Sequence, residues 1–253
     1  MRPLHPEIKK SIEVAARFGF VSRDIFENFI TTKKQSMRYR LWDRIKKSKY
    51  FETYNNTAIS TSYLKLSPHG KRKSESYTKF LNVSAPSPQQ LMHDEVLVRF
   101  ALQNERKGSF DFAWPESYTK KYDVMFARHF IARHLKFPDL LFELGGPDKK
   151  FKVALEFEQS RKSNARYQTN LLSYSVLKQV DLVIYVTSHH AIEKAIMDAA
   201  LRVNYPFDKK PIAFAQAIDF ISNPSDFSLQ LGGRILSFAN LVESLRQRQL
   251  SAA

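Results

Sequence analysis

Two apolar stretches in the second half of the chain contain carboxylates, and they limit the folds that the chain can adopt. They are residues 137–144 (FPDLLFEL) and residues 153–162 (VALEFEQSRK). A buried strand holds an ionised Asp or Glu only where a cation compensates the charge or the pKa is strongly raised. Glu156 and Glu158 are two residues apart, so they share one face of a strand. Residues 145–148 (GGPD) form a strong turn signal, which predicts a hairpin that brings Asp139 close to Glu156.

The length and composition of the chain limit its class. A chain of 253 residues is long enough for one large domain or two small ones, and the lack of cysteine excludes disulfides and thiolate metal sites. No apolar run approaches the roughly 20 residues that span a bilayer, and the first 20 residues mix Glu7, Glu13 and several basic residues, unlike a secretory signal. We therefore expect a soluble cytoplasmic protein without membrane insertion.

The net charge of +15 is distributed unevenly. Residues 1–80 contain 18 Lys and Arg against 7 Asp and Glu, a net charge of +11, whereas residues 81–253 contain 22 against 18, a net charge of +4. This asymmetry indicates a polyanion-binding module at the N-terminal end, and nucleic acid is the expected polyanion. The alternative is a basic surface that is merely well solvated.

The first third of the chain reads as three short helices followed by two extended runs. One helix ends at Gly19, Ser22 can cap a second, and a third is expected to start at Thr31 or Thr32 with an apolar side formed by Met37, Leu41 and Ile45. Extended runs follow at residues 50–53 and 63–66, and the sequence Ser-Pro-His-Gly ends the second. This order resembles a winged helix-turn-helix, whose third helix enters the major groove. A generic helical bundle is the alternative.

The third helix carries most of the expected DNA contacts. They are Lys33, Lys34, Gln35, Ser36, Arg38, Tyr39, Arg40 and Arg44. We expect Arg44 and Lys46 to contact only the DNA backbone, and Trp42 to belong to the core. Residues 71–90 are rich in Lys, Ser and Pro and read as a linker. The expected domains are therefore 1–82, a winged helix, and 83–253.

The remainder of the chain predicts an α/β sandwich with a mixed sheet. A helix from Ser87 or Gln89 carries His93, Asp94 and Glu95 and precedes the two acidic strands. A helix at 160–177, a central strand at 182–187, a helix at 191–203 and an edge strand at 211–215 follow.

This order and the acidic residues resemble the PD-(D/E)XK nuclease superfamily over about residues 87–200. Pro138-Asp139 matches its Pro-Asp element, Glu156 its second carboxylate, and Glu95 the glutamate that many members place on the preceding helix. The chain departs from the pattern at Glu158, where most members have Lys. The run Glu-Phe-Glu-Gln-Ser-Arg-Lys behind a winged helix is similar to replication-relaxation proteins, in particular MobC-type conjugative relaxases.

The resemblance implies a relaxase that nicks one DNA strand at the transfer origin of a mobilisable plasmid or integrative element. Its partners would be that DNA and a relaxosome accessory protein. Mg²⁺ or Mn²⁺ would be held by Asp139, Glu156, Glu158 and Glu95, because phosphodiester cleavage requires charge neutralisation and an activated nucleophile. Glu158 could instead orient the attacking water. Lys162 or Arg161 would stabilise the phosphate, and Arg166 would contact DNA.

Each of these residues also has a structural interpretation. Asp139 could cap a turn, Glu156 and Glu158 could lie on a solvent-facing side of the strand, and Glu95 and Lys162 could be surface charges. His93 is a weaker candidate for a role at the metal. Two other functions stay open: a non-catalytic DNA-binding replication or relaxosome factor with a decayed nuclease fold, and a restriction-type endonuclease that cuts both strands.

Overall fold

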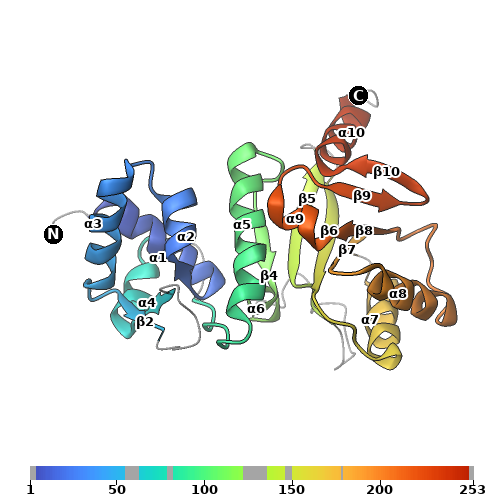
Figure 1. The fold of residues 1–253 in the computed structure, drawn as a ribbon, viewed down its shortest axis with the longest axis horizontal. Coiled ribbons are helices and arrows are strands. Elements are labelled where there is room, and N and C mark those ends of the chain that lie inside the picture. The colour runs from blue at the N-terminus through green and yellow to red at the C-terminus, as the bar shows by residue number, and fades with distance from the viewer. Residues whose placement is uncertain are drawn as a thin grey trace. The chain divides into compact units, whose positions relative to one another are not determined.

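The computed structural model describes residues 4–54, 63–78, 82–121, 136–145, 150–177 and 179–250. The chain divides into two compact units, Met1–Arg99 and Phe100–Ala253. The division falls inside helix α5 (Leu91–Lys107), which begins in the first unit and ends in the second (Figure 1).

The N-terminal unit is a small helical domain with a three-stranded antiparallel sheet. Its elements in chain order are α1 (Pro6–Phe18), β1 (Val21–Ser22), α2 (Arg23–Ile25), the π-helix η1 (Phe26–Ile30), α3 (Gln35–Lys46), β2 (Phe51–Thr53), β3 (Tyr63–Leu66), α4 (Pro68–Ser74) and the start of α5. The strand order is β1-β3-β2. The expected sequence of helices followed by a strand pair is therefore present.

Local signals set the first helix ends, and one expected start is wrong. Gly19 ends α1 because it adopts a left-handed conformation, with φ of 85°, and Ser22 caps α2 by accepting the Ile25 N–H at 3.1 Å. Helix α3 begins at Gln35 and not at Thr31 or Thr32. Thr31 is extended, and its hydroxyl accepts the Lys33 N–H at 3.2 Å, which holds these residues in a turn.

Helix α3 uses only part of its expected apolar side for the core. Trp42 and Ile45 are each 1% exposed, whereas Met37 is 50% exposed. The ring of Trp42 packs 5.4 Å from that of Phe26. The expectation that Trp42 belongs to the core is confirmed, and Met37 is free on the surface beside the basic residues.

The segment expected as a linker belongs in part to the N-terminal unit. Helix α4 starts at Pro68, and Ser67 caps it by accepting the Gly70 N–H at 3.0 Å. Further on, Val83 is buried and donates its N–H to the Ala16 carbonyl at 3.0 Å. Lys, Ser and Pro are frequent in linkers, but here helix α4 forms the start of the segment, and the buried side chain of Val83 and its hydrogen bond to Ala16 fix the chain further on. The boundary at 82/83 remains a prediction, since α5 runs across the division of the two units.

The C-terminal unit is built on a seven-stranded mixed sheet. Its strands are β4 (Ala113–Pro115), β5 (Leu140–Gly145), β6 (Lys150–Glu158), β7 (Leu182–Thr187), β8 (Ile212–Gln216), β9 (Ser228–Leu231) and β10 (Arg234–Ser237). They are ordered β10-β9-β8-β7-β6-β5-β4. Strands β6, β7 and β8 run parallel, and the remaining neighbours are antiparallel. The expected α/β class with a mixed sheet and the hairpin of the two acidic strands are confirmed.

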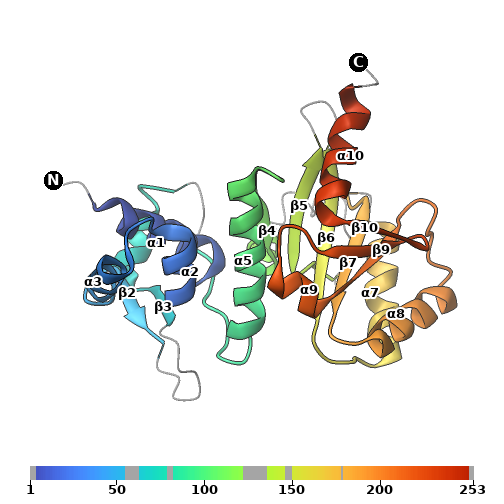
Figure 2. The same cartoon turned by 45° about the horizontal axis from the view of Figure 1, so that its top comes forward.

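Helices cover both faces of this sheet (Figure 2). They are the end of α5, α6 (Glu116–Lys121), α7 (Asn164–Val176), α8 (His190–Arg202), α9 (Ala217–Ser222) and α10 (Phe238–Leu250). Helices α7 and α8 pack with the sheet in a core that includes Tyr167, Tyr174 and Tyr185. The opposite core is aromatic, with Phe100 stacked at 5.1 Å on Phe220.

Strand β8 was expected to lie at an edge of the sheet, but it lies inside the sheet. It pairs with β7 on one side and with β9 on the other. The short strands β9 and β10 form a hairpin, and β10 is the last strand of the described sheet. Among the described residues, no helix is both long and apolar enough to cross a membrane.

Candidate functional site

The hairpin of β5 and β6 fixes Asp139 at the start of β5. Leu140 is paired with Leu155, which places Asp139 beside the end of β6. The Asp139 Oδ2 accepts the backbone N–H of Phe157 at 2.9 Å. Asp139 therefore ties two strands together, and its second oxygen, Oδ1, faces Lys136.

Lys136 joins the two carboxylates that the sequence predicted to meet. Its Nζ lies 3.2 Å from Asp139 Oδ1 and 3.1 Å from Glu156 Oε2, with Glu116 Oε1 at 4.0 Å. Burial alone would lower the pKa of Lys136, but the attraction of Glu156, Asp139 and Glu116 outweighs it, and the pKa is raised. The ammonium is thus the internal cation of the cluster formed by Lys136, Asp139 and Glu156, called the acidic cluster below.

Sequence reasoning missed Lys136. The chain shows it only as a lysine three residues before Asp139, outside any regular element. The signal that could have found it is the requirement for a cation beside carboxylates in an apolar run.

Glu156 is 0% exposed and lies on the sheet face that α7 covers. The hydroxyl of Tyr174 donates a hydrogen bond to its Oε1. Burial and the nearby charge of Asp139 raise the pKa of Glu156 to about 8, although Lys136 and Tyr174 act in the opposite direction. A solvent-facing role for Glu156 and Glu158 is excluded, because Glu158 is also only 1% exposed.

Glu158 is paired with Lys162, the residue expected to stabilise phosphate. The Lys162 Nζ donates to Glu158 Oε1. The backbone N–H of Lys162 donates to the hydroxyl of Tyr167 at 3.0 Å, which anchors the turn between β6 and α7. Ser163 caps α7 by accepting the Arg166 N–H at 3.3 Å, and the side chains of Arg161 and Arg166 are exposed around this turn.

Glu95, on α5, is 8% exposed. It lies in the N-terminal unit, where its carboxylate accepts hydrogen bonds from Ser22 Oγ at 2.5 Å and from the hydroxyl of Tyr63. The Nη2 of Arg99 lies 3.8 Å from its Oε1. This geometry gives Glu95 a structural role between α5, β1 and β3. On the same helix, His93 Nδ1 lies 2.9 Å from Asp94 Oδ1.

The donor atoms of the acidic cluster fit Mg²⁺ or Mn²⁺ in part. Oxygens of Asp139 and Glu156 already converge on one cation, and Mg²⁺ commonly uses one or two carboxylates and completes its shell with water and substrate phosphate. Within the described part of the chain, however, no group of three or more His, Asp or Glu side chains is arranged to hold a metal. This geometry therefore supports two protein ligands, Asp139 and Glu156, for a divalent cation.

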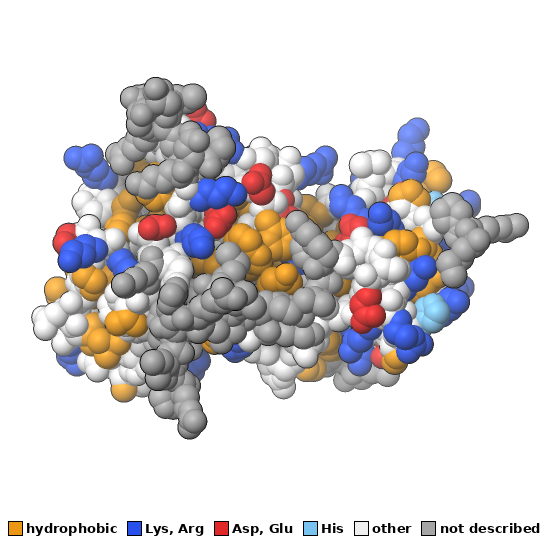
Figure 3. Space-filling model, turned by 180° about the vertical axis from the view of Figure 1, so that it is seen from behind, with side chains coloured by type: hydrophobic (Ala, Val, Ile, Leu, Met, Phe, Trp, Pro, Cys, Tyr) orange, Lys and Arg blue, Asp and Glu red, His pale blue; other side chains and the backbone are white. Residues whose placement is uncertain are grey.

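The expected DNA contacts lie on one outward side of α3 and the turn before it. Lys33, Lys34, Gln35, Ser36, Tyr39, Arg40 and Arg44 are exposed, and Arg38 is half-buried. The Arg38 Nε donates to the Lys33 carbonyl at 2.6 Å, and the guanidinium of Arg23 lies 4.0 Å above the ring of Tyr39. In Figure 3 the molecule is seen from behind, with its Lys and Arg side chains in blue.

No protein-family model, curated protein or solved structure matches the chain. The acidic cluster, the basic side of α3 and the charge of the N-terminal unit are the features that bear on function.

Proposed function

We propose that this protein is a metal-dependent DNA endonuclease that binds DNA through its N-terminal unit and cleaves one strand with its C-terminal unit. The observation that carries the proposal is the convergence of Asp139 and Glu156, from neighbouring strands of a mixed sheet, on one cationic atom. Carboxylates at such a position serve phosphodiester cleavage when a divalent cation joins them.

The element order supports two finer assignments. In the N-terminal unit, three helical segments precede the strands β2 and β3, and the exposed side of α3 is basic, as in a winged helix-turn-helix. In the C-terminal unit, α5, the antiparallel pair β5 and β6, the helix α7 and the parallel strand β7 follow the order of a PD-(D/E)XK nuclease core.

Each residue of the acidic cluster has a role in the proposed reaction. Asp139 and Glu156 would hold Mg²⁺ or Mn²⁺, which supplies charge neutralisation at the phosphate and lowers the pKa of a bound water. Tyr174 fixes the Glu156 carboxylate by donating to Oε1. Lys136 is the nearest ammonium to both carboxylates and would stabilise the negative charge that develops on the phosphate, the role that Lys fills at the position of Glu158 in most members of the superfamily.

We propose water as the nucleophile. Among the described residues, Tyr174 and Tyr185 beside Glu156 and Tyr167 near Glu158 are all 0% exposed, so these three hydroxyls cannot reach a DNA backbone. The resemblance to MobC-type relaxases narrows the substrate to a transfer origin, with nicking of one strand.

The test uses the full chain and a supercoiled plasmid that contains the DNA flanking its gene, incubated with Mg²⁺, Mn²⁺ or EDTA. We expect open circles with metal and none with EDTA. Linear product would indicate cleavage of both strands, and unchanged plasmid with every metal would contradict the proposed reaction.

The second candidate function is a DNA-binding replication or relaxosome factor without cleavage activity. The observation that favours it is that lysines of the chain already pair with the three carboxylates. Lys136 pairs with Asp139 and Glu156, and Lys162 pairs with Glu158. Specific DNA binding by the full chain, together with no cleavage in any metal, would select this candidate.

A further inference from the structure

Helix α4 is a second basic element of the N-terminal unit, separate from α3. Its sequence is PHGKRKS, and Lys71 and Arg72 are exposed. Lys47 and Lys49, at the end of α3 and before β2, are exposed as well. None of these four side chains forms an ion pair with a carboxylate of the described residues. Four uncompensated cations on one small unit repel each other, and a polyanion relieves that repulsion.

The structure fixes α4 against the segment that contains Lys49 and Tyr50. The Ser67 N–H donates to the Tyr50 carbonyl at 3.0 Å, and the Ser67 hydroxyl donates to the Lys49 carbonyl at 2.6 Å. Gly70 permits this approach, because a Cβ at its position would lie 2.1 Å from the Tyr50 carbonyl oxygen. The basic residues of α4 are therefore held at a set distance from Lys49 and are not on a loose tail.

Aromatic rings lie among these cations. The rings of Tyr50 and His69 are 5.2 Å apart, and Lys49 Nζ lies 5.9 Å from the centre of the Tyr50 ring. Desolvation and the charges of Lys49, Arg72 and Lys73 lower the pKa of His69, so three cations act on one ring. Rings beside cations are common where proteins contact nucleic acid backbones, because ring hydroxyl and nitrogen atoms hydrogen-bond to phosphate.

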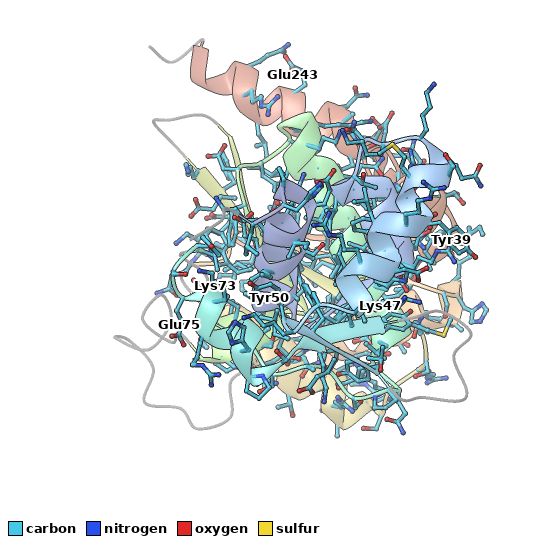
Figure 4. The ribbon with its side chains drawn as sticks, turned by 90° about the vertical axis from the view of Figure 1, so that its left-hand side faces the viewer. Tyr39, Lys47, Tyr50, Lys73, Glu75 and Glu243 are labelled. Atoms are coloured by element: carbon cyan, nitrogen blue, oxygen red, sulfur yellow. The ribbon has the colours of Figure 1, made fainter. Side chains whose placement is uncertain are left out.

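Residues of α3 and α4 lie on the same side of the N-terminal unit. Figure 4 shows Tyr39, Lys47, Tyr50 and Lys73 on the side of the N-terminal unit that faces the viewer, in order from α3 to α4. Strands β2 and β3 lie between them, since α3 contacts β2, β2 contacts β3, and β3 contacts α4.

We propose that α4, together with Lys49 and Tyr50, is a second DNA-binding surface that contacts the phosphate backbone next to the segment contacted by α3. This inference rests on the proposed function and extends the length of DNA that the N-terminal unit covers. Duplex DNA fits better than a membrane, because the described part of α4 exposes no large apolar side chain.

The test measures binding of the full chain to a short duplex, limited to the α3 footprint, and to a longer duplex that extends on both sides. The double variant Lys71→Ala/Arg72→Ala is compared with wild type and with Lys194→Ala/Lys209→Ala, which removes two exposed lysines from the C-terminal unit. Circular dichroism checks that each variant folds.

The double variant should bind the long duplex about tenfold more weakly at moderate salt, and its plot of log K against log salt should be shallower by about 2, since each phosphate contact contributes about 0.9. Its affinity for the short duplex and its sequence preference should equal those of wild type. The lysine control should match wild type in slope.

An unchanged slope on the long duplex would overturn the inference. So would equal losses on both duplexes. The variant Arg40→Ala on α3 separates this failure from that of the proposed function: if it weakens binding while the α4 variant does not, DNA binding by α3 stands and only the second surface is wrong.

Discussion

At the scale of single residues, the C-terminal unit places ionisable groups where an apolar core would be simpler. Glu156 is wholly buried. The side chain of Lys136 is 17% exposed, and its ammonium lies beside the carboxylates of both Glu156 and Asp139. Replacing such charges with apolar residues is often neutral or stabilising for a fold. Their presence beside each other at one end of the strands therefore favours a chemical role over a purely structural one.

The variant Lys136→Met tests the role of the internal cation. Removing an ammonium that stabilises charge in a transition state commonly lowers a rate by about 100-fold to 1,000-fold. We expect cleavage of supercoiled DNA to fall by that order, while Mn²⁺ binding, followed by calorimetry, is retained or tighter because the competing cation is gone. Cleavage at the wild-type rate would show that Lys136 only balances charge. The exposed Lys209→Ala is the matched control.

Glu156 gives the stability of the protein a pH dependence of known sign. The folded state keeps a proton on Glu156 up to pH of about 8, whereas the unfolded chain releases it near 4.5. Between these values the folded state binds more protons, so the free energy of unfolding falls as the pH rises, and this contribution is constant above pH 8.

Urea unfolding in EDTA across this range should therefore show a smaller fall in stability for Glu156→Gln than for wild type. Ionisable groups distant from Glu156 contribute equally to both proteins, so the difference between the two curves reports Glu156 together with the neighbours coupled to it, Asp139 and Lys136. Parallel curves would contradict the raised pKa.

The pair Glu158 and Lys162 predicts an asymmetric effect of substitutions. Lys162→Ala leaves the Glu158 carboxylate, 2% exposed, without its partner, whereas Glu158→Gln leaves a lysine whose side chain is 21% exposed and reaches water. We expect Lys162→Ala to lower the free energy of unfolding by about 2 kcal/mol, which is less than the roughly 3 to 5 kcal/mol lost when one partner of a fully buried ion pair is removed. Glu158→Gln should lower it by less than about 1 kcal/mol. Urea denaturation measures both, and equal losses would refute the asymmetry.

At the scale of elements, the N-terminal unit holds the first half of α5 through Glu95. Ser22 has two functions there: it caps α2 and donates a hydrogen bond to Glu95. Ser22→Ala should lower the free energy of unfolding by about 2 kcal/mol, the sum of a lost cap and a lost buried hydrogen bond. Ser163→Ala, at the exposed cap of α7, is the matched control and should cost about 1 kcal/mol.

Urea unfolding measures both serine variants. The same measurement on Glu95→Gln, combined with a cleavage assay, decides the role of Glu95. If Glu95→Gln destabilises the chain as Ser22→Ala does and leaves metal-dependent cleavage intact, Glu95 is structural. Loss of cleavage with unchanged stability would support its expected role as a metal ligand.

The elements with strong local signals were predictable from the sequence. Strand β7 and the hairpin of β5 and β6 follow from long apolar runs and a glycine turn, and Gly19 and Ser22 mark helix ends. Helix α4 was missed because its composition is that of a linker, and its position depends on hydrogen bonds with the Lys49–Tyr50 segment. The core-facing side of α3 was predicted in part: Ile45 is buried as its spacing suggests, but Met37 is exposed and Trp42 is buried, because tertiary packing decides which neighbours of Ile45 face the core.

The candidate site was predictable only in part, because some of its contacts depend on tertiary packing and not on local sequence. The approach of Asp139 to Glu156 follows from strand pairing, which a sequence shows well. The partners Lys136 and Tyr174 come from other segments, and their contacts depend on how those segments pack on the sheet.

At the scale of the whole molecule, the proposed function assigns DNA affinity to one unit and chemistry to the other. Under the proposed function, phosphate contacts of the strongly basic N-terminal unit would supply affinity that weakens steeply with salt, and the acidic cluster would supply the reaction. Substitutions in the two units should therefore change different measurements, binding in one case and cleavage in the other.

The most direct test of this account measures DNA binding and metal-dependent nicking side by side for the full-length variant Asp139→Ala. The account predicts that nicking of supercoiled DNA in Mn²⁺ is abolished while the Kd for the same DNA stays within a few-fold of wild type, and that Asp219→Ala, an exposed acid on α9, retains both. Nicking by Asp139→Ala at the wild-type rate would contradict it.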